Sequence, residues 1–184
     1  MENVFINPNK HSQFSWEKLG DIKEGRGSLG EEMPVLVYRL MQFTMLDVLA
    51  RDFGSEKAND YLRGAGHLAG LEFTRNVMDI TADFDTFVAD LQKTLRELKI
   101  GILRLEVFDP ETGEIILTVG EDLDCSGLPI TGETVCDYDE GFIAGILEAY
   151  TGKSYAVHEI DCWANGDMVC RFRGVADESE GNIL

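Results

Sequence analysis

Four cysteines are the residues of this sequence with the most distinctive chemistry, and all lie between positions 125 and 170. Thiolates are good zinc ligands, and in a reducing compartment cysteines rarely form disulfides. Two of them, Cys162 and Cys170, flank Asn165-Gly166-Asp167, a turn signal typical of a β-hairpin. A hairpin places such residues on facing strands, close enough to share a metal ion. A metal site at this hairpin is therefore one hypothesis that the sequence raises.

The other ligands of this predicted site are not fixed by spacing. Zinc prefers four donors in a tetrahedron, so two more are needed. The further donors that the sequence offers are Cys125, Cys136, His158, Glu159 and Asp161. The spacing lacks a CxxC pair, and buried cysteines are also common as apolar core residues. Spacing alone therefore leaves both the metal interpretation and the core interpretation open.

The charge of the chain excludes several classes of function. Its 184 residues include 16 basic and 34 acidic side chains, which gives a formal net charge of −18. Binding to duplex phosphates or to an anionic membrane surface requires clustered Lys and Arg, which this sequence lacks. We therefore expect neither nucleic acid nor a membrane as partner. The N-terminal residues have no basic and apolar regions of a signal peptide, which predicts a cytoplasmic protein.

The composition predicts one domain with a real core, because the apolar content of 44% is ordinary for a globular protein. A polar, glycine-punctuated arm is expected at residues 1–30, and dimerisation through this arm is a hypothesis. The domain itself is expected at residues 31–176, followed by an acidic tail at 177–184.

Apolar spacing of three and four residues predicts three helices before the first strand. These helices cover residues 34–54, 55–73 and 83–99. The spacing then becomes strand-like, and a fourth helix precedes the hairpin. The predicted strands and this helix cover residues 100–108, 114–119, 139–150, 154–162 and 168–175. This order predicts an α+β fold, with helices packed on an antiparallel sheet that ends in the C-terminal hairpin.

Glycines are unusually frequent in the second predicted helix, where Gly64, Gly66 and Gly70 occur. Each costs roughly 1 kcal/mol of helix stability relative to alanine. Either close helix packing or room for a ligand must offset this cost, and we favour close packing.

Beyond spacing, the chain resembles the V4R (4-vinyl reductase) domain family. The stretch Val135–Glu148 and single residues on both sides of it carry the resemblance. Downstream these are Gly152, Glu159, Cys162, Gly166, Asp167, Cys170 and Phe172; upstream they are Pro34, Val35, Tyr38, Arg39, Gly54, Gly64, Ala65, Gly66 and Gly70. The similarity covers roughly residues 26–176, and its most specific part is the pattern Cys…Glu-x-x-Cys-x7-Cys.

The resemblance implies a ligand set and a fold. In ligand-sensing members of the family the metal donors match Cys136, Glu159, Cys162 and Cys170. Such a closed zinc site has no position for water, so the zinc is expected to be structural. The implied α+β fold is shared with vesicle-tethering subunits and holds an apolar pocket between helices and sheet. Candidate ligand-binding residues for this pocket are His67, Phe73, Phe84, Phe87, Leu91 and Leu103, with Leu105 or Ile102 beside the last.

Binding is a better interpretation than catalysis, because the sequence has no Ser/His/Asp arrangement, phosphate loop or dinucleotide motif. The predicted function is a small-molecule sensor or carrier, a homodimer that passes its output to a separate signalling partner. An apolar lining favours a hydrocarbon, a lipid-like molecule or a tetrapyrrole as ligand. One competing hypothesis is an enzyme or accessory factor that acts on a tetrapyrrole, with His67 or Cys125 at the reactive end. The other is a pure scaffold without a ligand.

Overall fold

The computed structural model describes residues 14–177, which form two units. The first unit ends at Glu32 and contains a 3₁₀ helix, η1 (Trp16–Leu19), and a single helical turn, α1 (Ile22–Gly25). The second unit begins at Met33 and contains every other element. Most of the predicted acidic tail, residues 178–184, and the first part of the predicted arm, residues 1–13, lie outside the described residues.

Two long helices open the second unit, α2 (Val35–Phe53) and α3 (Ser55–Val77). They are separated by Gly54 alone, whose φ of +86° lies in the region that favours glycine. The predicted helix break at this glycine is therefore confirmed.

Helix α4 (Phe84–Glu97) begins where Asp83 caps it, since the Asp83 carboxylate accepts the backbone N–H of Thr86 at 3.1 Å. Its apolar residues recur every three or four positions, so one face is buried. The buried residues of this face are Phe87, Leu91 and Leu95.

The sheet has four antiparallel strands in the order β1-β2-β4-β3. They are β1 (Ile102–Asp109), β2 (Glu114–Gly120), β3 (Tyr155–Asp161) and β4 (Cys170–Ala176). The short helix η2 (Trp163–Asn165) lies between β3 and β4, so their connection is longer than the tight turn that the sequence suggests. The central strand β2 has Ile115, Leu117 and Val119 buried at alternate positions, as a sheet with one covered face requires.

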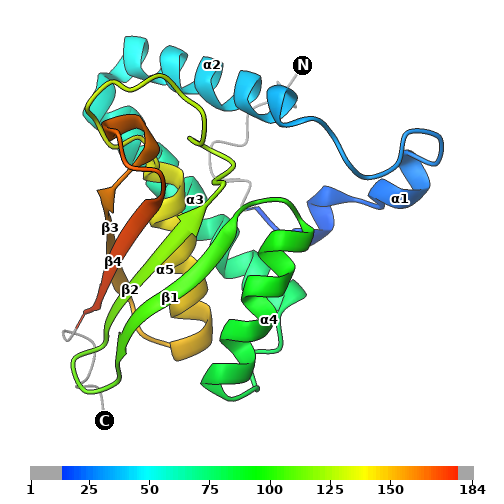
Figure 1. The fold of residues 1–184 in the computed structure, drawn as a ribbon. Helices are drawn as coiled ribbons and strands as arrows, with labels where there is room; N and C mark the ends of the chain where they lie inside the picture. Colours follow the sequence, from blue (N-terminus) through cyan, green and yellow to red (C-terminus); the bar gives the residue numbers. More distant parts are fainter. Residues whose placement is uncertain (1–13, 178–184) are drawn as a thin grey trace, which may run out of the picture. The chain divides into compact units, whose positions relative to one another are not determined.

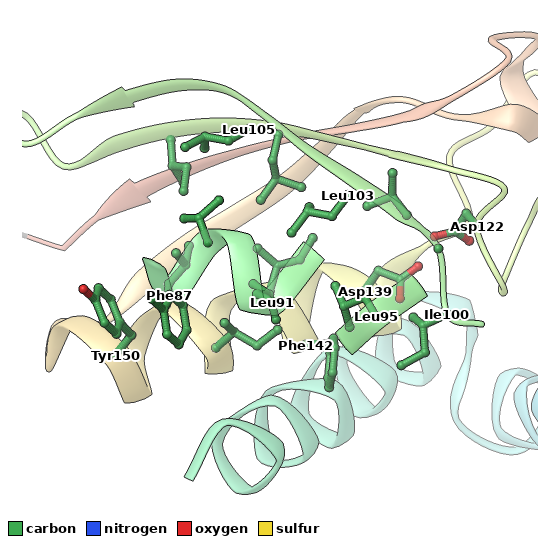
Figure 2. Close-up of a pocket in the computed structure, with 18 of the residues that line it drawn as sticks. Phe87, Leu91, Leu95, Ile100, Leu103, Leu105, Asp122, Asp139, Phe142 and Tyr150 are labelled. Carbon is green, nitrogen blue, oxygen red and sulfur yellow. The ribbon is translucent and has the colours of Figure 1, made fainter. Parts of the chain in front are cut away.

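Helices α3, α4 and α5 (Asp137–Thr151) of the second unit lie on one side of this sheet (Figure 1). Helix α4 packs on β1, and α5 packs on β3. Helix α3 packs on α5, and α2 packs on α3. The sheet therefore contacts α4 and α5, whereas α3 lies on the side of α5 away from it (Figure 2). The α+β architecture predicted from the sequence is confirmed.

The contact between α3 and α5 depends on four glycines. A Cβ atom built on Gly66 or Gly70 would lie 2.0 or 2.1 Å from a carbonyl oxygen of α5. One built on Gly141 or Gly145 would lie 2.0 or 2.2 Å from a carbonyl oxygen of α3. Close packing therefore explains the glycines at 66 and 70, as expected. A Cβ atom built on Gly64 would have no other atom within 4 Å, so this glycine has no part in the crossing.

Helix α2 contains no buried residue. Many of its apolar side chains are largely exposed, including Leu36, Leu40, Met41 and Met45. Within residues 14–177, no helix is both long and apolar enough to cross a membrane.

Candidate functional site

The four cysteines form one buried cluster. The sulfur atoms of Cys125, Cys136, Cys162 and Cys170 all lie within 4.8 Å of one another. The Cys125–Cys170 distance is 3.0 Å, and Cys136 lies 3.8 Å from Cys170 and 3.9 Å from Cys162. No more than 1% of any of these residues is exposed. Four converging sulfur atoms in a buried site are a donor set that suits zinc.

Three separate parts of the fold bring these sulfurs together. Cys162 directly follows β3 and Cys170 begins β4, so each lies next to a member of the paired residues Asp161 and Arg171. Cys136 is the residue before the first turn of α5. Cys125 comes from the loop after β2, where the carboxylate of Asp122 accepts its backbone N–H at 3.1 Å. The cluster therefore joins a hairpin, a helix and a loop.

The composition of the cluster differs in one position from the ligand set implied by the family resemblance. The predicted donors Cys136, Cys162 and Cys170 lie together. The other member of the sulfur cluster is Cys125, whereas the predicted donor Glu159 does not belong to the group. Cys125 is among the donors that spacing alone left open.

Glu159 lies beside this cluster in a buried position. Its Oε2 atom accepts the backbone N–H groups of Val135 at 3.2 Å and Cys136 at 3.1 Å. Its Oε1 atom is buried and has no hydrogen-bond partner among the described residues. Burial raises the pKa of Glu159 to about 8. The two remaining candidate donors lie elsewhere, because His158 is largely exposed and Asp161 pairs with Arg171.

The thiols influence one another's ionisation. Hydrogen bonds from the other three, that from Cys125 being the strongest, lower the pKa of Cys162 far below its ordinary value. The hydrogen bonds of Cys136 and Cys170, again chiefly with Cys125, raise the pKa values of these two thiols. The ionisation of each thiol thus depends on the others, and a divalent cation bound among them would stabilise the thiolate forms and release their protons.

An apolar cavity of about 60 Å³ lies between the helices and the sheet. Its walls come from α4, β1, β2 and α5, and Figure 2 shows their side chains converging on it. The apolar residues that line it are Phe84, Phe87, Val88, Leu91, Leu95, Ile100, Leu103, Leu105, Ile115, Leu117, Val119, Phe142, Ile143, Ile146 and Leu147.

Four of the six residues proposed for a ligand pocket line this cavity: Phe84, Phe87, Leu91 and Leu103. Of the two residues considered beside Leu103, Leu105 lines it and Ile102 does not.

His67 and Phe73 do not line the cavity, and the reason lies in the glycine crossing. The crossing places α3 against the side of α5 that faces away from the sheet. The Phe73 ring packs 5.4 Å from that of Phe142, which itself lines the cavity. The His67 Nε2 atom lies 2.8 Å from a Glu148 oxygen. Both predicted positions therefore lie outside this cavity.

Two acidic residues that sequence reasoning did not select form one end of the cavity. Asp122 is 4% exposed, and the Oδ2 atom of Asp139 is buried without a hydrogen-bond partner among residues 14–177. Burial raises the pKa of both, to about 6 for Asp122 and well above the ordinary value for Asp139. Carboxylate oxygens of both lie within 4.8 Å of each other and of the Cys136 sulfur. In Figure 2 the two acids lie at the end of the cavity opposite Tyr150.

An ionic network connects α3 to the region of the cysteine cluster. Arg63 of α3 donates to Asp137 at 2.5 Å and to Glu140 at 2.7 Å, both in the first turn of α5. The other oxygen of Glu140 accepts the backbone N–H of Glu159 at 2.8 Å. The first turn of α5, which follows Cys136, is therefore held from both sides.

Comparison with known families identifies the segment that carries the cysteines. The family model described as the V4R domain matches residues 115–176, from β2 to the end of β4. The resemblance to the V4R domain family is thereby confirmed over this segment.

Two uncharacterized proteins of Methanocaldococcus jannaschii are similar in sequence to this chain. One is 33% identical over 103 residues, which make up 56% of this chain and 58% of that protein. The other is 27% identical over 144 residues, which make up 78% of each protein. The chain thus spans little more than half the length of the first relative.

Three solved structures share the fold. The phenol-responsive sensory domain of the transcription activator PoxR, solved with phenol, has a TM-score of 0.62 at 14% identity, covering 80% of this chain and 76% of that domain. A vinyl-4-reductase family protein from Methanocaldococcus jannaschii has a TM-score of 0.53 at 16% identity, with 82% and 85% coverage. Subunit 3 of a trafficking protein particle complex from Naegleria fowleri, covalently bound to palmitic acid, has a TM-score of 0.61 at 12% identity, with 78% and 95% coverage. Identities this low show the fold alone, and the match to the trafficking-complex subunit confirms the predicted likeness of fold.

Proposed function

We propose that this protein is a small-molecule-binding module that acts as a sensor or carrier, and that a structural zinc ion stabilises it. The observation that carries the proposal is the apolar cavity enclosed by α4, β1, β2 and α5. Ligand sites are typically concave and largely apolar, with a few polar groups that orient the ligand. This cavity has that composition, because Asp122, Asp139 and Tyr150 are the polar side chains among the described residues that line it.

The ligand is a molecule with a slender apolar body. Two of the structural relatives hold molecules with apolar parts, phenol in one case and covalently bound palmitic acid in the other. A cavity of about 60 Å³ is well below the roughly 300–1,000 Å³ of sites for drug-sized ligands. A tetrapyrrole therefore fits least among the ligands considered. Among the described residues no histidine lines the cavity, and His67 pairs with Glu148, which weighs against the competing interpretation of an enzyme or accessory factor acting on a tetrapyrrole.

The proposed zinc ligands are the four thiolates of the cysteine cluster. Four thiolates complete a tetrahedral site, so no position remains for water and the metal has a structural role. Zinc there would fasten the Cys125 loop and the start of α5 to the hairpin of β3 and β4. The buried Glu159 carboxylate, with its unpartnered oxygen, is the competing fourth donor.

A homodimer is the oligomeric state that we propose, with α2 at the interface. In this helix Leu36 is 68% exposed, and Leu40 and Met41 are each 56% exposed. None of its residues is buried by the described part of the chain. A twofold interface would cover the same face on both copies. The output of the module would pass from this assembly to a separate signalling partner. Light scattering of the full chain tests the dimer, and a monomeric mass at micromolar concentration would contradict it.

The binding proposal is tested by a ¹H–¹⁵N chemical-shift titration of the full chain with 1-pentanol. We expect saturable shifts at the residues of α4, β1, β2 and α5 that line the cavity. The variant Leu103→Phe adds volume inside the cavity and should weaken binding at least tenfold, because the space for the pentyl chain is lost.

The matched control is Leu98→Phe, which makes the same substitution at a side chain that is 54% exposed. It should bind 1-pentanol as the wild type does. Equal affinity of the Leu103→Phe variant, or shifts confined to residues outside the cavity, would refute the proposed function.

A further inference from the structure

One end of the cavity carries two carboxyl groups, although the rest of its lining is almost entirely apolar. Asp122 and Asp139 offer carboxylate oxygens to the same space. Among the described residues, no Lys, Arg or His lines the cavity to pair with them. A buried carboxyl group needs a hydrogen-bond donor or a cation, since its unpartnered burial is costly.

One of the carboxyl oxygens at this end already has hydrogen-bond donors within the protein. The Oδ1 atom of Asp122 accepts the backbone N–H groups of Asp124 at 2.8 Å and Cys125 at 3.1 Å. The Asp139 Oδ2 atom is buried and has no partner within residues 14–177. Tyr150, at the opposite end, donates its hydroxyl to the Ala82 carbonyl oxygen at 3.0 Å and so has no free proton for the acids. Asp139, labelled in Figure 2, is therefore the carboxyl group at this end whose hydrogen bonding the described residues leave incomplete.

We propose that this cavity binds a small aliphatic amine, with its hydrocarbon chain between α4 and the sheet and its ammonium group against Asp139 and Asp122. The inference rests on the proposed function, because it concerns the same cavity and names the class of ligand that the cavity takes.

An ammonium group suits hydrogen bonding to these two carboxyl groups better than the other common head groups do. It has three N–H donors and no acceptor, so every hydrogen bond that it makes can end on a carboxylate oxygen. A hydroxyl group has one donor, and its lone pairs would face two further acceptors. A carboxylate has acceptors alone and would be repelled by both acids. A bare metal ion would use the acidic end but would bury none of the apolar wall.

The size of the cavity limits the body of the ligand. About 60 Å³ exceeds the roughly 15 Å³ that one water molecule needs, but it is less than the roughly 150 Å³ of a cavity that holds benzene. A pentyl chain with its head group has about as many heavy atoms as benzene, so shape and not volume separates the two. The lining residues extend from Tyr150 at one end to the two acids at the other, and a flexible unbranched chain can follow this path, whereas a rigid aromatic ring needs its full width at one place. Pentylamine, 1-pentanol and pentanoate share such a chain and differ in the head group alone.

The test compares the dissociation constants of these three probes for the full chain, measured by ¹H–¹⁵N chemical-shift titration. We expect pentylamine to bind at least tenfold more tightly than 1-pentanol, and pentanoate at least tenfold more weakly. In Asp139→Asn the amine preference over the alcohol should fall to about threefold or less. If that variant does not fold, Asp122→Asn replaces it, because an amide oxygen can still accept the backbone N–H groups.

The net charge of −18 attracts amines to the whole surface, so a matched control is needed. Asp90→Asn removes one carboxylate from an exposed position on α4 and should leave the preference unchanged. All titrations are repeated at high salt, which screens the exposed charges.

The possible failures are distinguishable. If none of the three probes shifts the cavity residues, the proposed function itself fails. If 1-pentanol binds in the cavity as tightly as pentylamine, or if Asp139→Asn keeps the full amine preference, the cavity binds small molecules but the inference about the amine is overturned.

Discussion

The glycine crossing of α3 and α5 gives a sharp prediction, because the same substitution has opposite effects two residues apart. Gly64 is exposed and an added Cβ there would have no atom within 4 Å, whereas a Cβ on Gly66 would lie 2.0 Å from the carbonyl oxygen of Tyr138. Both residues are helical, so alanine improves the local helix propensity by up to about 1 kcal/mol in each case. The difference between the variants therefore reports the packing of the two helices.

The expected magnitude follows from the contact distance. Ordinary van der Waals contact begins at 3.4 Å, so the Gly66→Ala methyl group requires the two helix backbones to separate by more than about 1 Å. Backbone atoms, unlike the end of a flexible side chain, do not rotate away. We expect Gly66→Ala to lower the free energy of unfolding by about 3 kcal/mol or more, as strong overpacking does. Gly64→Ala should raise it by up to about 1 kcal/mol.

The assay is urea unfolding of both variants and the wild type, followed by circular dichroism at one temperature. The helix content before unfolding shows whether each variant reaches the native fold. A Gly66→Ala variant as stable as Gly64→Ala would refute the close crossing of the two helices and, with it, the reason for excluding His67 from the cavity.

Three further predictions concern the metal centre and the charged groups around it. Elemental analysis should find about one zinc per chain in the wild type and in Glu159→Gln, but none in Cys125→Ser; retention in Cys125→Ser with loss in Glu159→Gln would assign the fourth donor to the carboxylate. Because the pKa of Asp122 is raised to about 6 in the folded protein, the stability associated with its protonated form is lost as pH rises from about 4 to 6. Asp122→Asn should therefore be more stable than the wild type at pH 7.5, by up to about 3 kcal/mol, and the difference should be smaller at pH 4.5. Urea unfolding at the two pH values measures this difference, and the absence of the trend would contradict the burial of a charged Asp122. Arg63→Gln should lower the free energy of unfolding by about 2 kcal/mol, discounted for the 41% exposure of Arg63, because Glu140 loses its partner; a double-mutant cycle with Glu140→Gln measures this coupling.

Much of the fold was predictable because the relevant signals are local. The three- and four-residue spacing of Phe87, Leu91 and Leu95 marks one buried helix face, and the observed α4 confirms it. The break between α2 and α3 was predictable from Gly54, whose positive φ suits no other residue as well.

The features that sequence reasoning left open or missed depend on how distant segments meet. Cys125 joins the other sulfurs because the loop after β2 turns at Asp122, and no spacing rule relates this loop to the hairpin. The family pattern instead pointed to Glu159, which lies next to the cluster. Asp122 and Asp139 share no sequence pattern, although Asp139 follows Cys136 by one helical turn, a position that could have marked it. His67 lies outside the cavity because Gly66 and Gly70 bring α3 against the side of α5 that faces away from the sheet.

The most direct test of the proposed function is the detection of intermolecular NOEs between the pentyl protons of bound 1-pentanol and the methyl groups of selectively labelled protein. We predict NOEs to Leu91, Leu103 and Ile143, which line the cavity. None should appear to Leu36, which is exposed on α2. NOEs confined to α2, or none at a saturating concentration of the alcohol, would contradict a ligand site between the helices and the sheet.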